Sequence, residues 1–414
     1  MANNILHVVN SQALGGGIGT VLDYLDQGLN QTGTYQSSIL KTNADDIGRD
    51  GYEQVEKDGM PGNFIYDQKF LEQEISNYDI IHIHGVPSYR ILEAIDSLRK
   101  KGYCPKIVNT CHSSVKKEVE AYLETSDETE DVKCLKDMVD YGLMQDPGRF
   151  NETYWGSAIY RQEKVMTFAD RVQHMNRSYL DEIVSEYSAE ENMFKQRVVY
   201  NGIDVIPERK ITSRPKKKRI LYSGRFAIEK GIEELIESLP KILAEHPDAE
   251  IKLMGGDKEG KVTNYYKEKT EALFRESFGS QASNYLDKIN FTGWLTDKQH
   301  IEDCYDWCDF LIAPSKDESF CLAVAEALNH QRIPIMTNTP SLNELYLSNN
   351  TGIGIEPENR DAEGIANVVN KALSEIGSIA MSENAREGRK LVTERYSLDA
   401  VMDQQIRLYE ELLK

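Results

Sequence analysis

The chain has 414 residues, of which 40% are hydrophobic and 28% are charged. At about 100–200 residues per domain, this length predicts two or three domains, and the hydrophobic content is too high for a disordered chain. The formal net charge is −20. Most of the surface would therefore repel nucleic acid, so no nucleic-acid partner is expected and any site for a phosphorylated ligand must be local.

Cysteine spacing and hydropathy give expectations for the compartment. The six cysteines are scattered without a C-x-x-C pair, so neither a zinc site nor a disulfide framework is predicted. The apolar run at residues 5–9 is too short for a signal-peptide core, and no stretch reaches the roughly 18–20 apolar residues that cross a bilayer. We expect a cytoplasmic protein that associates at most loosely with the inner face of the membrane.

Short apolar runs alternate with amphipathic stretches along the first half of the chain. A strand at residues 5–10, a glycine cluster at 15–19 and a helix near 20–31 form a β-loop-α opening. Further strands are predicted at residues 37–41, 63–66, 79–84, 106–111, 171–175 and 197–200. Because strands that alternate with helices pair in parallel, the pattern predicts a doubly wound α/β domain over residues 1–205.

Two segments depart from this alternation. Residues 113–169 form a long helical region, which we interpret as an elaboration on the first domain. Residues 206–218 are polar, contain Pro207 and Pro215, and lead into a basic run at 216–219. This composition is typical of a linker between domains, and we interpret the basic run as a solvated hinge in preference to a binding patch.

A second series of strands and helices follows the linker. Strands are predicted at residues 219–223, 249–254, 290–292, 310–313, 333–337 and 352–355, and helices near 361–376, 381–394 and 398–413. Residues 219–393 are therefore expected to form a second doubly wound α/β domain.

The glycine cluster of the first domain is a candidate anion site. Gly16 and Gly17 lie between the first strand and the first helix, where backbone N–H groups can approach a phosphate at the helix N-terminus. The spacing is not G-x-G-x-x-G, because Val21 and Leu22 occupy the place of the third glycine, and no Gly-Lys-Ser/Thr follows. A phosphate contact and a plain tight turn are both consistent with the cluster.

Three histidines stand at the ends of predicted strands in the first domain: His82, His84 and His112. Strand ends of a doubly wound sheet border its ligand crevice, and the period of two puts His82 and His84 on one face of their strand. A satisfied structural role is the alternative for each. No carboxylate at ligand spacing joins them, so a metal site is not predicted.

Two cations follow the first strand of the second domain. Arg225 and Lys230 lie on a loop that leads into a helix near residue 232. They could converge on a diphosphate, the guanidinium as a fork and the ammonium as a point charge. An acidic protein needs such cations only locally, and the alternative is two unrelated surface cations.

Two carboxylates lie eight positions apart further along the chain. Glu318 is in the loop before a predicted helix, and Glu326 falls about two turns later within an otherwise apolar helix. An ionised group there needs a partner, and a ribose diol can donate to it from both hydroxyls. The alternatives are a structural salt bridge for Glu326 and a carboxylate favoured by the helix dipole for Glu318.

Taken together, these motifs resemble the retaining GT-B glycosyltransferases of the family 4 type, which include many bacterial hexosyltransferases of cell-surface glycan assembly. The resemblance covers nearly the whole chain in the right order, and Arg225, Lys230 and the pair Glu318-x7-Glu326 are its specific part. It also runs through Gly16–Gly17, Asp79–His84, His112, Asn201–Asp204, Gly224, Gly231, Gly255–Gly256 and Gly293–Leu295.

The resemblance implies an α/β GT-B fold of two facing Rossmann-like domains, with a crossover helix at residues 394–414 that returns to the first domain. The nucleotide-sugar donor would bind mainly to the C-terminal domain and the acceptor mainly to the N-terminal one. The implied donor-binding residues are Gly16, Gly17, Arg225, Lys230, Gly255, Ser319, Phe320, Cys321, Leu322 and Glu326.

The resemblance also implies roles in catalysis. Arg225 and Lys230 would stabilise the charge that develops on the leaving diphosphate, Glu318 would hold the donor sugar, and His112 would lie beside the reacting sugar. His84 is a candidate contact for the acceptor. The sequence contains no Asp-x-Asp, so metal-independent transfer is expected, with no cofactor beyond the nucleotide-sugar substrate.

The implied reaction moves a hexose from a UDP-sugar, or secondly from GDP-mannose, to a hydroxyl of a glycan or lipid-linked glycan. Polysaccharide, capsule or lipopolysaccharide assembly would be its setting. The chain departs from the family pattern at Ser319, Cys321 and Gln331, where glycine is usual, and the first two bear on the donor sugar. The alternatives are a nucleotide-sugar epimerase of the same fold and a catalytically silent GT-B partner subunit.

Overall fold

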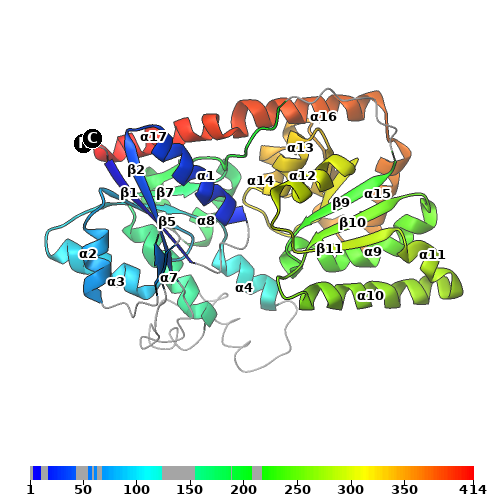
Figure 1. Cartoon of the computed structure of the whole chain (residues 1–414), viewed down its shortest axis with the longest axis horizontal. Helices are drawn as coiled ribbons and strands as arrows, with labels where there is room; N and C mark the ends of the chain where they lie inside the picture. The colour runs from blue at the N-terminus through cyan, green and yellow to red at the C-terminus, as the bar shows by residue number, and fades with distance from the viewer. Residues whose placement is uncertain are drawn as a thin grey trace. The chain divides into compact units, whose positions relative to one another are not determined.

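The computed structural model describes residues 3–10, 17–42, 55–57, 60–62, 68–123, 154–187, 189–207 and 217–414. The chain divides into two compact units. The first unit consists of residues 1–202 together with 398–414, and the second consists of residues 203–397. In each unit, helices cover both faces of a central sheet (Figure 1). The predicted α/β class is therefore confirmed.

The first unit contains, within its described residues, a sheet of eight strands in the order β4-β3-β2-β1-β5-β6-β7-β8. The strands are β1 (Asn3–Asn10), β2 (Tyr35–Thr42), β3 (Val55–Lys57), β4 (Met60–Gly62), β5 (Ile80–His84), β6 (Lys106–Thr110), β7 (Arg171–His174) and β8 (Gln196–Val198). Strands β2, β1, β5, β6, β7 and β8 are parallel to their neighbours in that order.

Strands β3 and β4 form an antiparallel hairpin at the edge of this sheet. The sequence pattern predicted only parallel pairing and missed the hairpin, because strands of three residues are too short to show an alternation. The strand predicted at 63–66 lies outside the described residues, as do the central part of the helical region, 124–153, and most of the predicted linker, 208–216.

Helices cover the two faces of the first sheet. They are α1 (Gly17–Gln31), α2 (Gln68–Ile75), α3 (Tyr89–Lys100), α4 (Val115–Leu123), α7 (Tyr154–Phe168), α8 (Arg177–Glu186) and α17 (Leu398–Leu413). Strand residues such as Leu6 and Ile81 pack under α2, α3, α7 and α8. Their neighbours Ile5 and Ile80 face the other way, toward α1 and α17. This alternation divides the apolar side chains of β1 and β5 between the two faces of the sheet.

The last helix, α17, is part of the first unit. The hydroxyl of Tyr409 lies 2.6 Å from Nδ1 of His82 on β5. At the end of the helix, Glu411 pairs with Arg171 at 2.6 Å and with Arg197. Hydrogen bonds from these two guanidinium groups lower the pKa of Glu411 to about 2. The helix is thus fixed to the sheet by polar contacts as well as by its apolar face.

Over residues 203–207 and 217–397, the second unit contains a parallel sheet of six strands in the order β11-β10-β9-β12-β13-β14. The strands are β9 (Arg219–Gly224), β10 (Glu250–Gly255), β11 (Ile289–Gly293), β12 (Phe310–Ala313), β13 (Ile333–Thr337) and β14 (Ile353–Ile355). The helices are α9 (Ile232–Glu245), α10 (Lys261–Phe278), α11 (Ala282–Leu286), α12 (Lys298–Trp307), α13 (Leu322–Asn329), α14 (Pro340–Leu345), α15 (Ala362–Ser374) and α16 (Ile379–Leu391). Its main core lies between the sheet and α9, α10 and α15.

Both sheets reverse their winding direction between two central strands. The reversal lies between β1 and β5 in the first sheet and between β9 and β12 in the second. Doubly wound sheets bind ligands in the crevice outside the carboxyl ends of such a pair. In the first sheet these ends are Asn10 and His84, and in the second they are Gly224 and Ala313. A ligand-binding site is therefore expected at each of these two edges.

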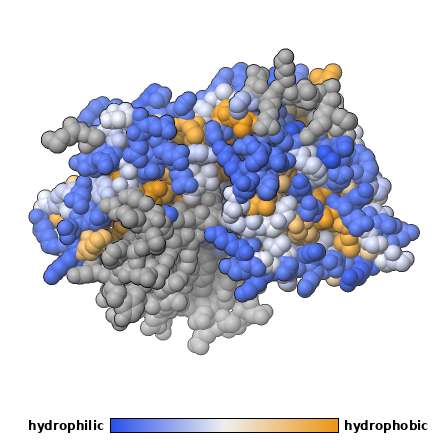
Figure 2. Space-filling view, viewed as in Figure 1, coloured by the Kyte–Doolittle hydropathy of each residue, from blue (hydrophilic) through white to orange (hydrophobic). Residues whose placement is uncertain are grey.

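On the face shown in Figure 2, the described side chains are mostly hydrophilic, and the apolar ones lie in small groups. This agrees with a sequence that holds 68 acidic and 48 basic residues. Among the described helices, none has both the length and the hydropathy that crossing a bilayer requires.

Candidate functional site

Two loops meet at the carboxyl edge of the second sheet, one after β9 and one after β12. After β9, Ile228–Lys230 form a short 3-10 helix and Gly231 leads into α9 with a φ of +68°. A Cβ on Gly231 would lie 2.2 Å from the carbonyl oxygen of Pro314, so only glycine allows the two loops to approach this closely. This contact places Lys230 beside the loop that contains Glu318.

Lys230 and Glu318 form a partly buried ion pair. The Nζ of Lys230 donates to Oε1 of Glu318 at 2.9 Å, and the Ser315 hydroxyl donates to the same oxygen at 3.0 Å. Only 11% of the Glu318 side chain and 24% of the Lys230 side chain are exposed. Burial lowers the pKa of Lys230, but the facing carboxylate of Glu318 outweighs it and the pKa is raised. The ammonium therefore stays charged at neutral pH.

Arg225 lies on the same loop but is more exposed, with 58% of its side chain accessible. Its Nη2 donates to Oε1 of Glu229 at 2.9 Å. Exposed pairs of this kind contribute little to stability, so the guanidinium can exchange its partner for another anion. The backbone is better fixed, because the Tyr222 hydroxyl donates to the carbonyl of Arg225 at 2.7 Å.

Glu326 lies on α13, and Tyr305 on α12 approaches it. The Tyr305 hydroxyl is 2.5 Å from Oε2 of Glu326 and 3.0 Å from Oγ of Ser223. A hydroxyl has one proton, so Ser223 donates to Tyr305 while Tyr305 donates to Glu326. Burial raises the pKa of Glu326, and the Tyr305 hydrogen bond opposes this. The salt bridge considered for Glu326 has no counterpart among the described residues, which leaves the carboxylate able to accept further hydrogen bonds.

The loop between Glu318 and α13 is held by a buried aromatic side chain. Phe320 packs edge-on against Tyr346 and Tyr396, and its carbonyl accepts a hydrogen bond from the Tyr346 hydroxyl at 2.9 Å. Cys321 is buried in the left-handed region with a φ of +60°, which strains a residue other than glycine. Because Phe320 points into the core, a ligand at this loop would meet backbone N–H groups at the start of α13. The predicted contacts at Ser319 and Leu322 stay predictions.

Gly255 at the end of β10 supports the loop after β9. It has a φ of +143°, and a Cβ there would lie 1.7 Å from the carbonyl oxygen of Gly224. The ends of the two strands thus meet backbone to backbone, next to Arg225. The structure gives Gly255 a clear structural role, and its predicted donor contact stays a prediction.

In the first unit, His84 and His112 meet at the carboxyl edge of the sheet. Nδ1 of His84 lies 3.3 Å from Nε2 of His112, and Nε2 of His84 lies 2.9 Å from Nδ1 of His7. His84 is fully buried, whereas His112 is partly exposed. The geometry therefore favours His112 as the member of the group that meets a ligand. It does not favour the direct acceptor contact predicted for His84.

His82 has the structural role that the sequence left open. Its Nδ1 is 2.6 Å from the Tyr409 hydroxyl, and its Nε2 is 2.6 Å from Oγ1 of Thr110. Both ring nitrogens are therefore used to bind α17 and β6. His7, which the sequence analysis did not single out, completes the group from β1. The pairing of β1 with β5 places His7 beside His82, because parallel neighbours on one face lie side by side, and the sequence alone does not give that pairing.

Nitrogen atoms of His7, His82 and His84 lie within 4.8 Å of one another, a spacing that could hold a metal ion. Their lone pairs do not converge, however. Both nitrogens of His82 are bonded to hydroxyl groups, and both nitrogens of His84 are bonded to other histidines. The donor set therefore fits a hydrogen-bonded cluster better than a tetrahedral cage.

The glycine cluster is described only in part. Gly16 lies outside the described residues, and Gly17 is the exposed first residue of α1. A phosphate contact at this loop stays a prediction.

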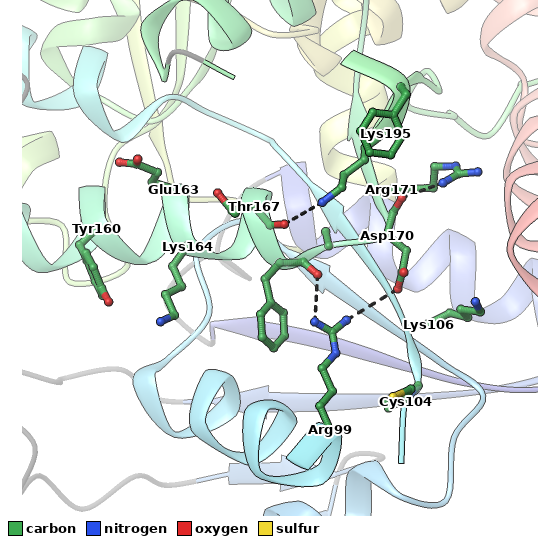
Figure 3. A pocket seen from close by; sticks show the side chains of 14 residues that line it. Arg99, Cys104, Lys106, Tyr160, Glu163, Lys164, Thr167, Asp170, Arg171 and Lys195 are labelled. Carbon is green, nitrogen blue, oxygen red and sulfur yellow. Dashed lines mark hydrogen bonds and ion pairs between the residues drawn. The ribbon is translucent and has the colours of Figure 1, made fainter. Parts of the chain in front are cut away.

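A hollow of about 820 Å³ lies at the opposite edge of the first sheet, where β6 and β7 begin (Figure 3). Cations and aromatic rings line it; Lys195 donates to the Thr167 carbonyl at 2.8 Å and Arg99 to the Phe168 carbonyl at 3.3 Å. None of the predicted site residues lines it. No local pattern in the sequence predicts this hollow, because its walls come from segments far apart in the chain.

Comparison with known families identifies the region that holds the charged loops. Residues 206–388 match the family described as glycosyl transferases group 1. Over 267 residues, the chain is 26% identical to an uncharacterized glycosyltransferase of Methanocaldococcus jannaschii, covering 61% of this chain and 63% of that protein. It is 24% identical over 201 residues to a GDP-mannose:cellobiosyl-diphosphopolyprenol alpha-mannosyltransferase of Xanthomonas campestris, covering 48% and 47%. The chain thus spans about half of the length of one of these relatives and less than two thirds of the length of the other.

Solved structures extend the likeness to the whole chain. A sucrose-phosphate synthase from Thermosynechococcus elongatus superposes with a TM-score of 0.67 at 18% identity, covering 99% of both chains. HepE of Anabaena, solved in complex with UDP and glucose, superposes with a TM-score of 0.63 at 12% identity, covering 99% of this chain and 100% of that one. At these identities the likeness shows the fold.

Proposed function

We propose that the chain is a glycosyltransferase, because residues 206–388 match the glycosyl transferases group 1 family and because the chain has the GT-B fold expected from its motifs. It would move a sugar from a nucleoside-diphosphate donor to a hydroxyl group of an acceptor. The observation that carries this proposal is the group of charged residues at the switch point of the second sheet. Lys230 with Glu318 and Tyr305 with Glu326 lie within the matched region.

Lys230 would bind the diphosphate. An ammonium has three N–H bonds, and Glu318 accepts from one of them, so two remain for phosphate oxygens. Arg225 on the same loop would add a planar fork once it exchanges Glu229 for phosphate. As the bond between the sugar and the diphosphate oxygen breaks, its electron pair stays on the diphosphate. Fixed cations stabilise that growing negative charge more in the transition state than in the bound substrate.

Glu326 would bind the ribose. Tyr305 holds one oxygen of its carboxylate, and the remaining lone pairs can accept hydrogen bonds from the two ribose hydroxyls. Burial disfavours the charged form of Glu326, as its raised pKa shows, so each added donor makes the carboxylate more stable. The nucleotide and the carboxylate would therefore stabilise each other.

The finer assignments rest on the resemblance of the motifs. Glu318 would hold hydroxyls of the donor sugar, His112 would lie beside the reacting sugar, and the reaction would retain the anomeric configuration of a hexose. The absence of Asp-x-Asp supports transfer without a metal ion. The names of the similar proteins include both GDP-mannose and UDP, so experiment must decide whether the donor carries UDP or GDP.

The acceptor would be a glycan or a lipid-linked glycan. The mannosyltransferase of Xanthomonas campestris, by its name, acts on a cellobiosyl-diphosphopolyprenol, which supports a lipid-linked acceptor here. The protein would meet such a carrier by loose association at the cytoplasmic face of the membrane. Co-sedimentation with vesicles that is lost at high salt is expected, and binding that resists high salt would contradict loose association.

Calorimetric titration with UDP, GDP and ADP in EDTA tests the donor site. We expect one nucleotide to bind without added Mg²⁺ or Mn²⁺, and Lys230→Ala to abolish that binding. Lys241→Ala is the matched control, because Lys241 on α9 pairs only with Glu363 at the surface among the described residues. Binding that needs a divalent cation would overturn the metal-free proposal. No binding by any nucleotide would overturn the donor site and favour a silent subunit.

A second assay separates transfer from epimerisation. With the nucleotide-sugar that binds, a transferase releases nucleoside diphosphate faster when glycan acceptors are present, whereas an epimerase forms its product without any acceptor. We expect acceptor-dependent release. Conversion of the donor sugar alone would contradict the proposed function.

A further inference from the structure

Three histidines of the first unit are joined end to end by hydrogen bonds. His7 on β1, His84 at the end of β5 and His112 after β6 form this histidine row. Nδ1 of His7 is 2.9 Å from Nε2 of His84, and Nδ1 of His84 is 3.3 Å from Nε2 of His112. The rings of His84 and His112 also stack, with 5.5 Å between centroids. The row leads from the interior of the unit to its one partly exposed member, His112.

Burial keeps the row neutral at physiological pH. It lowers the pKa of His7 to about 3, that of His112 to about 4, and that of His84 well below its ordinary value. A neutral imidazole has one protonated and one bare nitrogen, so it donates with one and accepts with the other. His84 uses both nitrogens within the row. The protons must therefore point in one direction along the whole row, either toward His112 or toward His7.

The hydrogen bonding of His7, at the inner end of the row, decides in which direction the protons point. Nε2 of His7 is buried and has no hydrogen-bond partner among the described residues. If the protons pointed toward His7, its Nδ1 would accept and its Nε2 would carry a buried N–H without an acceptor. If the protons point toward His112, Nε2 of His7 carries no proton and is a buried acceptor without a donor. Unpaired buried N–H groups are rarer in proteins than unpaired acceptors, so the second arrangement is favoured.

We propose that His84, backed by His7, is a positioning residue that holds His112 in the tautomer with its proton on Nδ1. Nε2 of His112 then accepts from His84, and its Nδ1 carries the proton as a hydrogen-bond donor. Which nitrogen of a histidine carries the proton is set by the hydrogen bond at the other nitrogen. The role toward a sugar oxygen rests on the proposed function, but the tautomer does not.

His82 lies next to the histidine row but is not part of its chain of hydrogen bonds. It lies on the same face of β5 and stacks on His84 with 4.1 Å between ring centroids. Its two nitrogens nevertheless bond to Tyr409 and Thr110, so it takes no part in the proton order of the row. Two histidines on one strand face thus have different tasks, one fixing the last helix and the other orienting His112.

Nitrogen NMR of the full chain with ¹⁵N-labelled histidine tests the tautomer directly. The His112 signals are assigned by their loss in His112→Gln. We expect a neutral His112 with a protonated Nδ1 from pH 6 to 8. A proton on Nε2, or a charged ring in this range, overturns the inference, and so does a stoichiometric metal ion bound to His7 and His84 in the purified protein.

Two substitutions of His84 separate orientation from packing. Asn places a side-chain N–H near the position of Nδ1, so His84→Asn should keep the His112 tautomer, whereas His84→Leu should move the proton to Nε2. His174→Leu is the matched control, because His174 is equally buried at the end of β7 and bonds to Gln196 at 2.7 Å, outside the row. The same tautomer in His84→Leu as in the wild type would overturn the role of His84.

Kinetics then connect the tautomer to turnover. With the donor that binds, His84→Leu should lower kcat at least about tenfold with KM unchanged, and His84→Asn should restore most of it. Equal losses in both variants would reduce His84 to packing and overturn the inference. The two proposals fail separately: without nucleotide binding the proposed function fails while the NMR result stands, and with a proton on Nε2 of His112 the inference fails even where nucleotide binds.

Discussion

At the carboxyl edge of the first sheet, buried imidazoles contact one another; at the same edge of the second sheet, a lysine contacts a carboxylate. The difference follows from what covers each edge. In the first unit, α17 packs on the face that carries His7, His82 and His84, and the histidines there are neutral. In the second unit, Lys230 and Glu318 form an ion pair whose two side chains keep part of their surface in water.

This contrast teaches how one fold can serve two ligands. A buried neutral group can be ordered by its tautomer without the cost of removing a charge from water. A charged group must keep water or a partner, and it can exchange either for an anionic ligand. Under the proposed function, the first edge would contact the hydroxyl groups of a sugar and the second edge would bind a diphosphate.

Acid should distinguish the two units most strongly. The pKa values of His7, His82 and His84 are lowered in the folded unit, so below pH 6.5 the unfolded chain binds more protons than the folded one and stability falls as pH falls. With a pKa of about 3, His7 alone removes about 2 kcal/mol between pH 7 and 5, and His82 and His84 act in the same direction. In the second unit, the raised pKa of Glu326 acts in the opposite direction.

Differential scanning calorimetry at pH 7 and pH 5 measures this difference. The transition of the second unit is identified by its rise on addition of nucleotide, because a ligand stabilises the unit that binds it. We expect the other transition to fall further between pH 7 and 5. If the nucleotide-sensitive transition falls further instead, the histidines are not neutral and buried as described.

Removing the cation of the second edge should give the next largest effect. Lys230→Met leaves Glu318 without its partner and takes the positive charge from the proposed diphosphate site. We expect kcat/KM for donor turnover to fall about a thousandfold, or about 4 kcal/mol. Lys241→Met should stay within about twofold, because its pair with Glu363 is exposed. Equal activity of the two variants would contradict the proposed role of Lys230 at the edge of the second sheet.

The backbone contact beneath the charged loop gives a smaller effect on stability. Gly255→Ala would place a Cβ against the carbonyl of Gly224, at 1.7 Å in the present backbone. We expect a loss of about 3 kcal/mol in urea unfolding of the second unit. Gly279→Ala is the control, because Gly279 also has a positive φ but has no atom within 4 Å of the added Cβ. Gly279→Ala should lower the free energy of unfolding by about 1 kcal/mol. Equal losses in the two variants would show that the ends of β9 and β10 can separate to make room for a side chain.

The sequence predicted those elements whose signals are local. Alternation of apolar runs and helical stretches located the six strands of the second sheet to within a residue or so, and the spacing of Glu318 and Glu326 indicated the loop before α13. The position of Lys230 after the first strand of that domain was enough to place it at the ligand edge. In these cases one segment contained the whole signal.

The contacts that the sequence did not reveal join separate segments. Tyr305 lies 21 residues before Glu326 on another helix, and no spacing rule connects a tyrosine to a carboxylate there. His7 shares a face with His82 and His84, yet pairing of β1 with β5 had to be known before its place could be seen. Register between strands depends on tertiary packing, which a single segment does not encode.

The smallest expected effect distinguishes the proposed ribose contact at Glu326 from the proposed diphosphate contact at Lys230. Glu326→Gln keeps the shape of the side chain but replaces a charged acceptor by a neutral one, so the Kd of the nucleoside diphosphate should rise about tenfold, or about 1.4 kcal/mol. Pyrophosphate has no ribose, so its Kd should be unchanged by Glu326→Gln, whereas Lys230→Met should weaken both ligands. Calorimetry with the two ligands on the two variants measures this. A loss of pyrophosphate affinity in Glu326→Gln would mean that Glu326 acts by holding the loop rather than by binding the ribose.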